Sequence, residues 1–204
     1  MNDHYYTQNP TSAHRPGEAL VRALGLEMRF ETDAGVFSRD GLDAGSRLLL
    51  ESLPPLEGRV LDLGCGWGAI GVTLALKYPA AQIVLSDINA RAVDLARLNI
   101  RRLGAVNARA LESDGFEAVS GDFDFIVTNP PIRAGKRVIY EMFSQANSRL
   151  RPNGRLYLVI RKQQGAPSAL KYLSGLFGDA RVIERGGGYW IIQCQKTGGE
   201  NNAQ

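Results

Sequence analysis

Four consecutive residues, Asn129-Pro130-Pro131-Ile132, have the composition needed to hold a planar exocyclic amino group. The lone pair of such a group is drawn into a π-system, so its nitrogen is a poor nucleophile. Two acceptors on its N–H bonds, Asn129 Oδ1 and the Pro130 carbonyl, can steer the lone pair toward a methyl donor. Adjacent prolines suit this task because each fixes its own φ and extends the residue before it. The run predicts an active site that works by positioning, without a strong base.

A glycine-rich turn at Gly64-Cys65-Gly66 follows a strand-like run and precedes a helical one. Glycines at such a turn let the backbone approach a ligand at the carboxyl edge of a sheet. Asp62, just before the turn, would repel a pyrophosphate but attract the cationic amino and sulfonium groups of S-adenosylmethionine. Gly64, Gly66 and Ala69 also satisfy the dinucleotide spacing, which leaves a dehydrogenase as a competing interpretation. The charge of Asp62 favours the methyl donor.

Two further acids follow later strands of the same pattern. Asp87 ends the second strand, where its carboxylate can accept hydrogen bonds from both ribose hydroxyls. Asp114 can accept from an adenine amino group, with Phe116 or Ile88 against the ring. The residues predicted to contact the cofactor are Asp62, Gly64, Cys65, Gly66, Asp87, Ile88, Asp114 and Asn129.

Basic residues come directly after the Asn-Pro-Pro-Ile run. Arg133, Lys136 and Arg137 are expected to rim the acceptor pocket and to grip phosphates beside a flipped nucleotide. Arg161 and Lys162 end a later strand at the same edge. Solvated surface charge is the alternative for both groups.

The elements that must position these residues alternate between strands and helices, which predicts a parallel, doubly wound sheet. Gly104, Gly154 and Gly178 are expected to stop helices. The chain end predicts an antiparallel hairpin at the sheet edge, and Gly35–Ser38 is expected to pair with Leu26–Thr32. The predicted strands are 59–63, 83–87, 107–111, 123–128, 155–160, 180–184 and 189–195, and the predicted helices are 42–52, 69–77, 90–103, 138–150 and 168–177.

Length and composition limit the class of protein. A chain of 204 residues with 44% apolar content fits one α/β domain, and its apolar runs are too short for a membrane span. The first residues lack a secretory signal, so we expect a cytoplasmic protein. Cys65 and Cys194 have no metal-ligand spacing and are expected to be reduced thiols, with no bound metal. A net charge of +3 suits a nucleic-acid partner without requiring one.

With these motifs, the sequence resembles class I S-adenosylmethionine-dependent methyltransferases of the small-domain type, in particular single-domain bacterial 16S rRNA (guanine-N2) methyltransferases. The resemblance covers nearly the whole chain. Beyond the motifs already given, it is carried by residues 4–6, 32–38, 43–47, 132–136 and 162–169.

The resemblance implies a Rossmann-like sheet of about seven mostly parallel strands with an antiparallel final strand, plus a short N-terminal extension. It implies S-adenosylmethionine as donor, a guanine N2 amino group in 16S ribosomal RNA as acceptor, and the small ribosomal subunit or its RNA as partner. Phe37 would help to close over the cofactor, supported by Asp43 or Arg47. The expected divisions are an extension and lid at 1–57, a methyltransferase domain at 58–196 and a flexible tail at 197–204.

The sequence departs from the family in two ways. Better-studied relatives carry an additional amino-terminal domain, for which this chain has no room, so RNA docking must come from elsewhere. Many amino-methylating relatives have an aromatic residue where this chain has Ile132, and the target base stacks on it. The stacking surface is then lost or moved, with Tyr5, Tyr6 and Phe37 as candidates.

Other functions remain open from the sequence. The same tetrapeptide can hold a protein glutamine or the amino group of another nucleobase, including one in DNA. A binding module that keeps the fold without catalysis is a further alternative, which the presence of Asp62, Asp87 and Asn129 disfavours. Either a monomer or a homodimer is compatible with the sequence.

Overall fold

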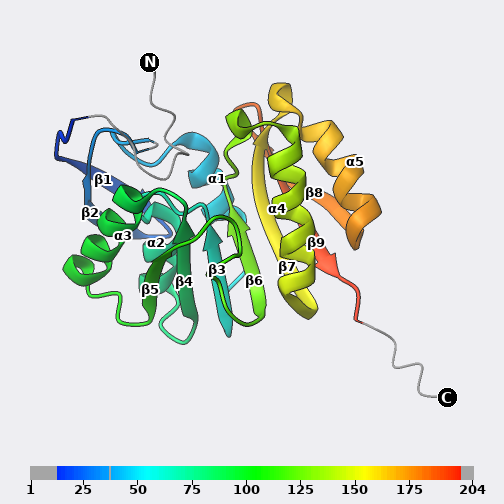
Figure 1. The fold of residues 1–204 in the computed structure, drawn as a ribbon, viewed down its shortest axis with the longest axis horizontal. Coiled ribbons are helices and arrows are strands. Elements are labelled where there is room, and N and C mark those ends of the chain that lie inside the picture. Colours follow the sequence, from blue (N-terminus) through cyan, green and yellow to red (C-terminus); the bar gives the residue numbers. More distant parts are fainter. Residues whose placement is uncertain (1–12, 37, 199–204) are drawn as a thin grey trace.

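The computed structural model describes residues 13–36 and 38–198, which are built around a seven-stranded sheet (Figure 1). The strand order is β5-β4-β3-β6-β7-β9-β8, and the first five of these strands run parallel. Strand β9 lies antiparallel between β7 and β8. The predicted fold class and antiparallel final strand are therefore confirmed. The strands are β3 (Arg59–Leu63), β4 (Gln82–Asp87), β5 (Ala108–Glu112), β6 (Phe123–Thr128), β7 (Leu150–Arg161), β8 (Gly178–Gly186) and β9 (Tyr189–Lys196).

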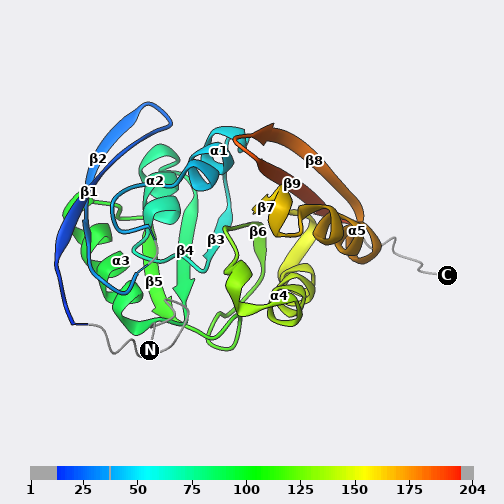
Figure 2. The same ribbon diagram turned by 90° about the horizontal axis from the view of Figure 1, so that it is seen from above.

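Helices cover both faces of the sheet because successive side chains of each strand point to opposite sides. In β3, Val60 packs into the hydrophobic cluster under α1 and α2, whereas Leu61 packs into the cluster under α4 and α5. Figure 2 shows these two helical layers from above. The helices are α1 (Ala44–Ser52), α2 (Ala69–Lys77), α3 (Ala90–Leu103), α4 (Lys136–Arg149) and α5 (Ala166–Phe177), with 3-10 turns η1 (Ile132–Ala134) and η2 (Lys162–Gln164).

Helix α3 shows why several predicted bounds are correct. Asn89 caps its first turn by accepting a hydrogen bond from the Ala92 N–H at 3.2 Å. Gly104 ends it with a φ of 70°, in the left-handed region that glycine enters without a Cβ penalty. Gly178 likewise follows the last residue of α5.

The prediction that Gly154 stops a helix is wrong, because Gly154 lies inside β7. That strand begins at Leu150, five positions before the predicted start. Asn153 takes a φ of 64°, and the pairing of β6 with β7 shifts register at this end. The irregular start of the strand contains Pro152, so its sequence lacks the usual strand pattern.

The N-terminal hairpin also differs from the prediction. Strand β2 (Leu26–Thr32) pairs with β1 (Gly17–Ala23), whereas residues 35, 36 and 38 form no strand. The turn is made by Leu24 and Gly25, which both have positive φ angles, 53° and 79°. Leucine rarely adopts such a φ, so no recognisable turn pattern marks this position in the sequence.

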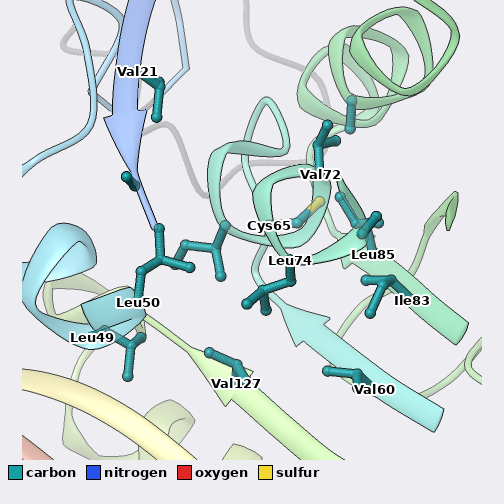
Figure 3. Packing of buried hydrophobic residues seen from close by; sticks show 14 of the residues in the cluster. Val21, Leu49, Leu50, Val60, Cys65, Val72, Leu74, Ile83, Leu85 and Val127 are labelled. Atoms are coloured by element: carbon teal, nitrogen blue, oxygen red, sulfur yellow. The ribbon is translucent and has the colours of Figure 1, made fainter. Parts of the chain in front are cut away.

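One face of this hairpin is buried against the domain core. Val21 lies in the same cluster as Leu50 and Leu74 (Figure 3). The ring of Phe30 meets Trp67 edge-on, with 5.0 Å between centroids. The β1–β2 hairpin therefore packs on the core, while the predicted division of the chain at residue 57 stays a prediction.

Candidate functional site

A cavity of about 630 Å³ opens at the carboxyl ends of β3, β4 and β6. The strand order reverses between β3 and β6, and α/β sheets bind ligands at such a switch point. Most of the predicted site residues line this cavity: Gly64, Cys65, Gly66, Asp87, Ile88, Asp114, Asn129, Pro130, Pro131, Ile132 and Arg133.

The glycine loop forms one wall of the cavity. Gly64 and Gly66 have φ angles of 74° and 54°, and a Cβ at either position would have no atom within 4 Å. The N–H groups of Gly64 and Cys65 both donate to the Ser86 carbonyl, at 2.8 and 2.9 Å. The loop is thus fixed to the end of β4 and leaves open space above its glycines, as the sequence predicts for a ligand loop.

Asp87 connects this loop to the next helix. Its Oδ2 accepts from the Gly66 N–H at 2.8 Å, and its Oδ1 accepts from the Asn89 N–H at 2.9 Å. Burial raises the pKa of the Asp87 carboxyl, although these backbone hydrogen bonds oppose the rise. The carboxylate therefore both shapes the loop and contributes to the cavity wall.

Asp62 occupies a different place from the one expected for a ligand contact. It is fully buried beneath the loop and does not belong to the cavity wall. Its Oδ2 accepts from the Gly71 N–H in the first turn of α2 at 2.7 Å, and its Oδ1 has no partner among the described residues. Burial raises the pKa of Asp62 to about 7, and the charge of Asp87 adds to the rise. Asp62 can act on a ligand only through the loop or through its charge.

The titration of Asp62 gives a stability prediction. Its folded pKa lies near 7 against an ordinary value of 3.8, so the folded state retains a proton that the unfolded state loses as the pH rises. Stability therefore falls as the pH rises between these values. From pH 5 to pH 8, Asp62 should cost the wild type roughly 3 kcal/mol, at about 1.4 kcal/mol per pKa unit. Asp62→Asn should remove this loss in urea unfolding curves measured without ligand.

Asp94→Asn on α3 supplies the control for this measurement, because it makes the same change from carboxyl to amide at an exposed side chain. Equal slopes of unfolding free energy against pH in the wild type and Asp62→Asn would contradict the proposed titration.

Asn129 stands where the end of β6 meets α1. Thr128 Oγ1 donates to the Leu63 carbonyl at 2.7 Å, which holds the ends of β6 and β3 together. The Asn129 Nδ2 donates to Ser46 Oγ at 3.0 Å and to Asp43 Oδ2 at 3.5 Å. A carboxylate only accepts hydrogen bonds, so Asp43 determines which end of the amide faces α1. Oδ1 is then the end left for a ligand.

Asp43 also stabilises the first turn of α1. This carboxylate caps the helix by accepting from the N–H groups of Gly45 and Ser46, at 2.9 and 3.1 Å. Arg47 instead donates to the Arg22 carbonyl of β1. Asp43 also lines the cavity, whereas Arg47 contacts the N-terminal hairpin. Phe37, Tyr5 and Tyr6 lie outside the described residues.

The basic residues divide into two sets. Arg133 and Arg161 line the cavity, whereas Lys136, Arg137 and Lys162 are exposed and lie outside its wall. The Lys136 ammonium sits 5.1 Å from the ring centroid of Tyr140. The predicted phosphate contacts of Lys136 and Arg137 stay predictions.

Several residues that line the cavity were not predicted as site residues, among them Ser46 and Tyr189. An N-cap signal at Asp43 identifies the helix start, but no local signal shows that this helix meets β6. Phe116 packs in the core cluster below the sheet instead of the cavity, so of the two side chains expected against an adenine ring only Ile88 lines the wall.

Within residues 13–36 and 38–198, no group of three His, Cys, Asp or Glu side chains could hold a metal ion. Cys65 and Cys194 are both free thiols. No helix in this part of the chain is long and apolar enough to cross a membrane.

Comparisons with known proteins agree on one family. A family model described as "Methyltransferase small domain" matches residues 27–193. The uncharacterized protein YbxB of Bacillus subtilis (strain 168) is 40% identical over 201 residues, which is 97% of this chain and 100% of that protein. Ribosomal RNA small subunit methyltransferase C of Pseudomonas entomophila (strain L48) is 34% identical, over 79% of this chain and 49% of that protein.

A solved structure is similar at the level of both fold and sequence. It is the T. thermophilus 16S rRNA N2 G1207 methyltransferase (RsmC) in complex with AdoMet and guanosine. The TM-score is 0.79 and the identity 32%, covering 92% of this chain and 52% of that one. This chain thus spans about half the length of the named rRNA methyltransferases that it matches.

Proposed function

Because this chain belongs to the methyltransferase small domain family, we propose that it methylates the exocyclic N2 amino group of a guanine in small-subunit ribosomal RNA. It is an S-adenosylmethionine-dependent methyltransferase. One observation carries the proposal: two sets of residues line the same cavity. The glycine loop and Asp87 form one wall, and Asn129 and Pro130 form the other. A methyl donor and an amino acceptor held by these walls would be neighbours.

The residues of the first wall fit the proposed donor. S-adenosylmethionine supplies an electrophilic methyl group when bound. Gly64, Cys65 and Gly66 would let it approach the backbone, since side chains at the two glycines would fill that open space. Asp87 offers a carboxylate for ribose hydroxyls, and the acids Asp87 and Asp114 in the wall suit a ligand that is cationic and carries no phosphate. The proposed part of Asp62 is indirect, through the loop that lies above it. Ile88 and Asn129 complete the proposed contacts.

On the acceptor side, the chain's task is to orient a weak nucleophile. Asn129 Oδ1 and the Pro130 carbonyl would accept the two N–H bonds of the amino group and direct its lone pair toward the donor wall. Asp43 and Ser46 support this role because they hold the other end of the Asn129 amide. The nitrogen becomes cationic as it gains the methyl group and then releases a proton readily to water, so no strong base is required.

The RNA substrate is supported by the named relatives, which are ribosomal RNA methyltransferases, and by guanosine in the similar structure. We propose that Arg133, Lys136 and Arg137 contact phosphates beside the target nucleotide. The enzyme would then act in the cytoplasm on the small ribosomal subunit or its RNA.

The same cavity supports a proposed division of the chain into an extension and a catalytic domain. Residues 58–196 would form the catalytic domain. Residues 1–57 would form an extension that closes over the donor, which Val36, Ser38 and Leu42 support because they line the cavity.

The test of this function is incubation of the full chain with tritiated S-adenosylmethionine and either naked 16S RNA, assembled small subunits or total protein, followed by nucleoside analysis. We expect label in N2-methylguanosine. Label in methylated glutamine, or in another nucleoside, would overturn the acceptor assignment while leaving the donor assignment in place.

Ser46 should act as a positioning residue for Asn129. Ser46→Ala removes the 3.0 Å acceptor of the amide and should lower kcat by roughly tenfold, the scale of one hydrogen bond, with little change in KM for RNA. Ser52→Ala, which removes a hydroxyl that bonds the Leu48 carbonyl on the same helix, should keep kcat within about twofold. A fall in both variants alike would indicate damage to α1 instead of a role in positioning.

A further inference from the structure

We propose that the acceptor base stacks against a planar pair formed by Arg161 and Tyr189. The proposal rests on the methylation of an RNA base argued above and names the surface that holds that base. Both side chains line the cavity that contains Asn129 and Ile132. The Arg161 Cζ lies 4.8 Å from the centroid of the Tyr189 ring.

Tyr189 is the aromatic side chain best placed to meet a ligand in this cavity. Among the described residues of the wall, the other aromatic one is Trp67. Trp67 is only 2% exposed and packs edge-on against Phe30 in the core. Tyr189 is half-buried and Arg161 is exposed, so this pair keeps surface available. Ile132, on the tetrapeptide itself, offers an aliphatic side chain and no ring.

The pair is held rigidly from two sides. Arg161 and Tyr189 are register partners where β7 meets β9, and the Lys162 N–H donates to the Gly188 carbonyl at 2.8 Å. From α1, Gly45 lies so close to the ring that a Cβ there would come within 2.7 Å of Tyr189 Cε1. Figure 2 shows α1 beside the turn of the β8–β9 hairpin. Side chains that are already fixed lose little conformational entropy when a ligand binds to them.

The chemistry of the pair fits a nucleobase. Unstacked bases in RNA are recognised by stacking on aromatic rings or on the guanidinium plane of arginine, with hydrogen bonds to their edges. Gln164, at the end of η2, also lines the cavity and carries both a donor and an acceptor for such an edge. The Arg161 guanidinium lies over the Tyr189 ring, and its own planar face is also able to stack.

Substitutions of Tyr189 give the first test. The measurement is the steady-state rate of methylation of the RNA that the wild type modifies. Tyr189→Leu should raise KM for RNA on the order of 10- to 100-fold, the loss expected when one stacked base loses its ring. Tyr189→Phe keeps the ring and should stay within about threefold of the wild type. In both variants, calorimetry should give a Kd for S-adenosylmethionine within about twofold of the wild type.

Arg161 and Arg185 form a matched comparison, because each guanidinium lies over an aromatic ring of β9. Arg185 lies 4.9 Å from the ring centroid of Trp190, outside the cavity wall. Arg161→Ala should raise KM for RNA about tenfold, and Arg185→Ala should leave it within about twofold. Arg161→Lys should behave like Arg161→Ala, since an ammonium keeps the charge and loses the plane. A KM restored by lysine would show a phosphate contact and overturn the proposal.

Gly45→Ala tests the pair without changing either member. Alanine favours a helix over glycine, so α1 itself should not lose stability. The added Cβ would displace the Tyr189 ring and should raise KM for RNA.

A Tyr189→Leu enzyme with wild-type KM would overturn the stacking proposal alone. A wild type that methylates no RNA base would instead remove the proposed function on which it rests, so the two failures are distinguishable.

Discussion

Asn129→Ala is expected to abolish methyl transfer while S-adenosylmethionine still binds. The substitution removes the Oδ1 that is proposed to accept from the target amino group, and it leaves the glycine loop and Asp87 in place. Loss of one preorganised hydrogen-bonding group at a reacting centre costs on the order of a hundred- to a thousandfold in kcat. Because Asn129 also sets the direction of the lone pair, we expect the upper end of this range, measured with saturating RNA and tritiated donor.

The same experiment separates catalysis from folding. Asn147→Ala removes an amide of equal size from α4, outside the cavity wall, where its Nδ2 donates to the Leu176 carbonyl at 3.4 Å. That variant should keep activity within about twofold. Near-normal turnover by Asn129→Ala would contradict the mechanism, and a large rise in the Kd for S-adenosylmethionine would show that the donor contact of Asn129 outweighs its role toward the acceptor.

Asp87→Ala should weaken donor binding on the order of a hundredfold. The carboxylate accepts from Gly66 and Asn89, so its loss releases the loop as well as the proposed ribose contact. A hydrogen bond to a charged group contributes about 1.5–3 kcal/mol, so the net loss of one such bond to the donor accounts for the expected effect. Calorimetric Kd values for S-adenosylmethionine measure it directly.

Asp94→Ala is the matched control, because this aspartate lies exposed on α3 and pairs with Arg97 at 3.1 Å. Its Kd should equal that of the wild type. At saturating donor, Asp87→Ala should recover most of its kcat, since Asp87 does not contact the acceptor. A kcat that stays low at saturation would mean that Asp87 shapes the acceptor wall too.

The core of the fold was predictable because its signals are local. The bounds of β3, α2, α3 and β6 agree with the sequence prediction, since alternating or helical apolar patterns end at clear caps and glycines there. Strand β1 was missed because its turn uses Leu24 with a positive φ, which no turn pattern anticipates. The start of β7 was missed because Pro152 and Asn153 resemble a loop.

The site was predictable only where its residues follow strands. Gly64, Asp87 and Asn129 follow parallel strands, whose carboxyl ends must meet at one edge. Ser46 and Tyr189 reach the same cavity from a helix before the sheet and from an antiparallel strand at its far side, and only tertiary packing brings them there. The burial of Asp62 under the loop likewise depends on how α2 packs, which its position in the motif does not reveal.

The hairpin that carries Tyr189 lies at the edge of the sheet, and β8 reaches the sheet only through β9. Edges of a fold open more easily than its centre, and they do so without global unfolding. Mild heat or denaturant should therefore release the proposed base-stacking pair, Arg161 and Tyr189, before the glycine loop, which is fixed to the central strands. A partly opened enzyme would still bind S-adenosylmethionine but would no longer bind RNA. The affinity for RNA should therefore fall under milder conditions than the affinity for S-adenosylmethionine.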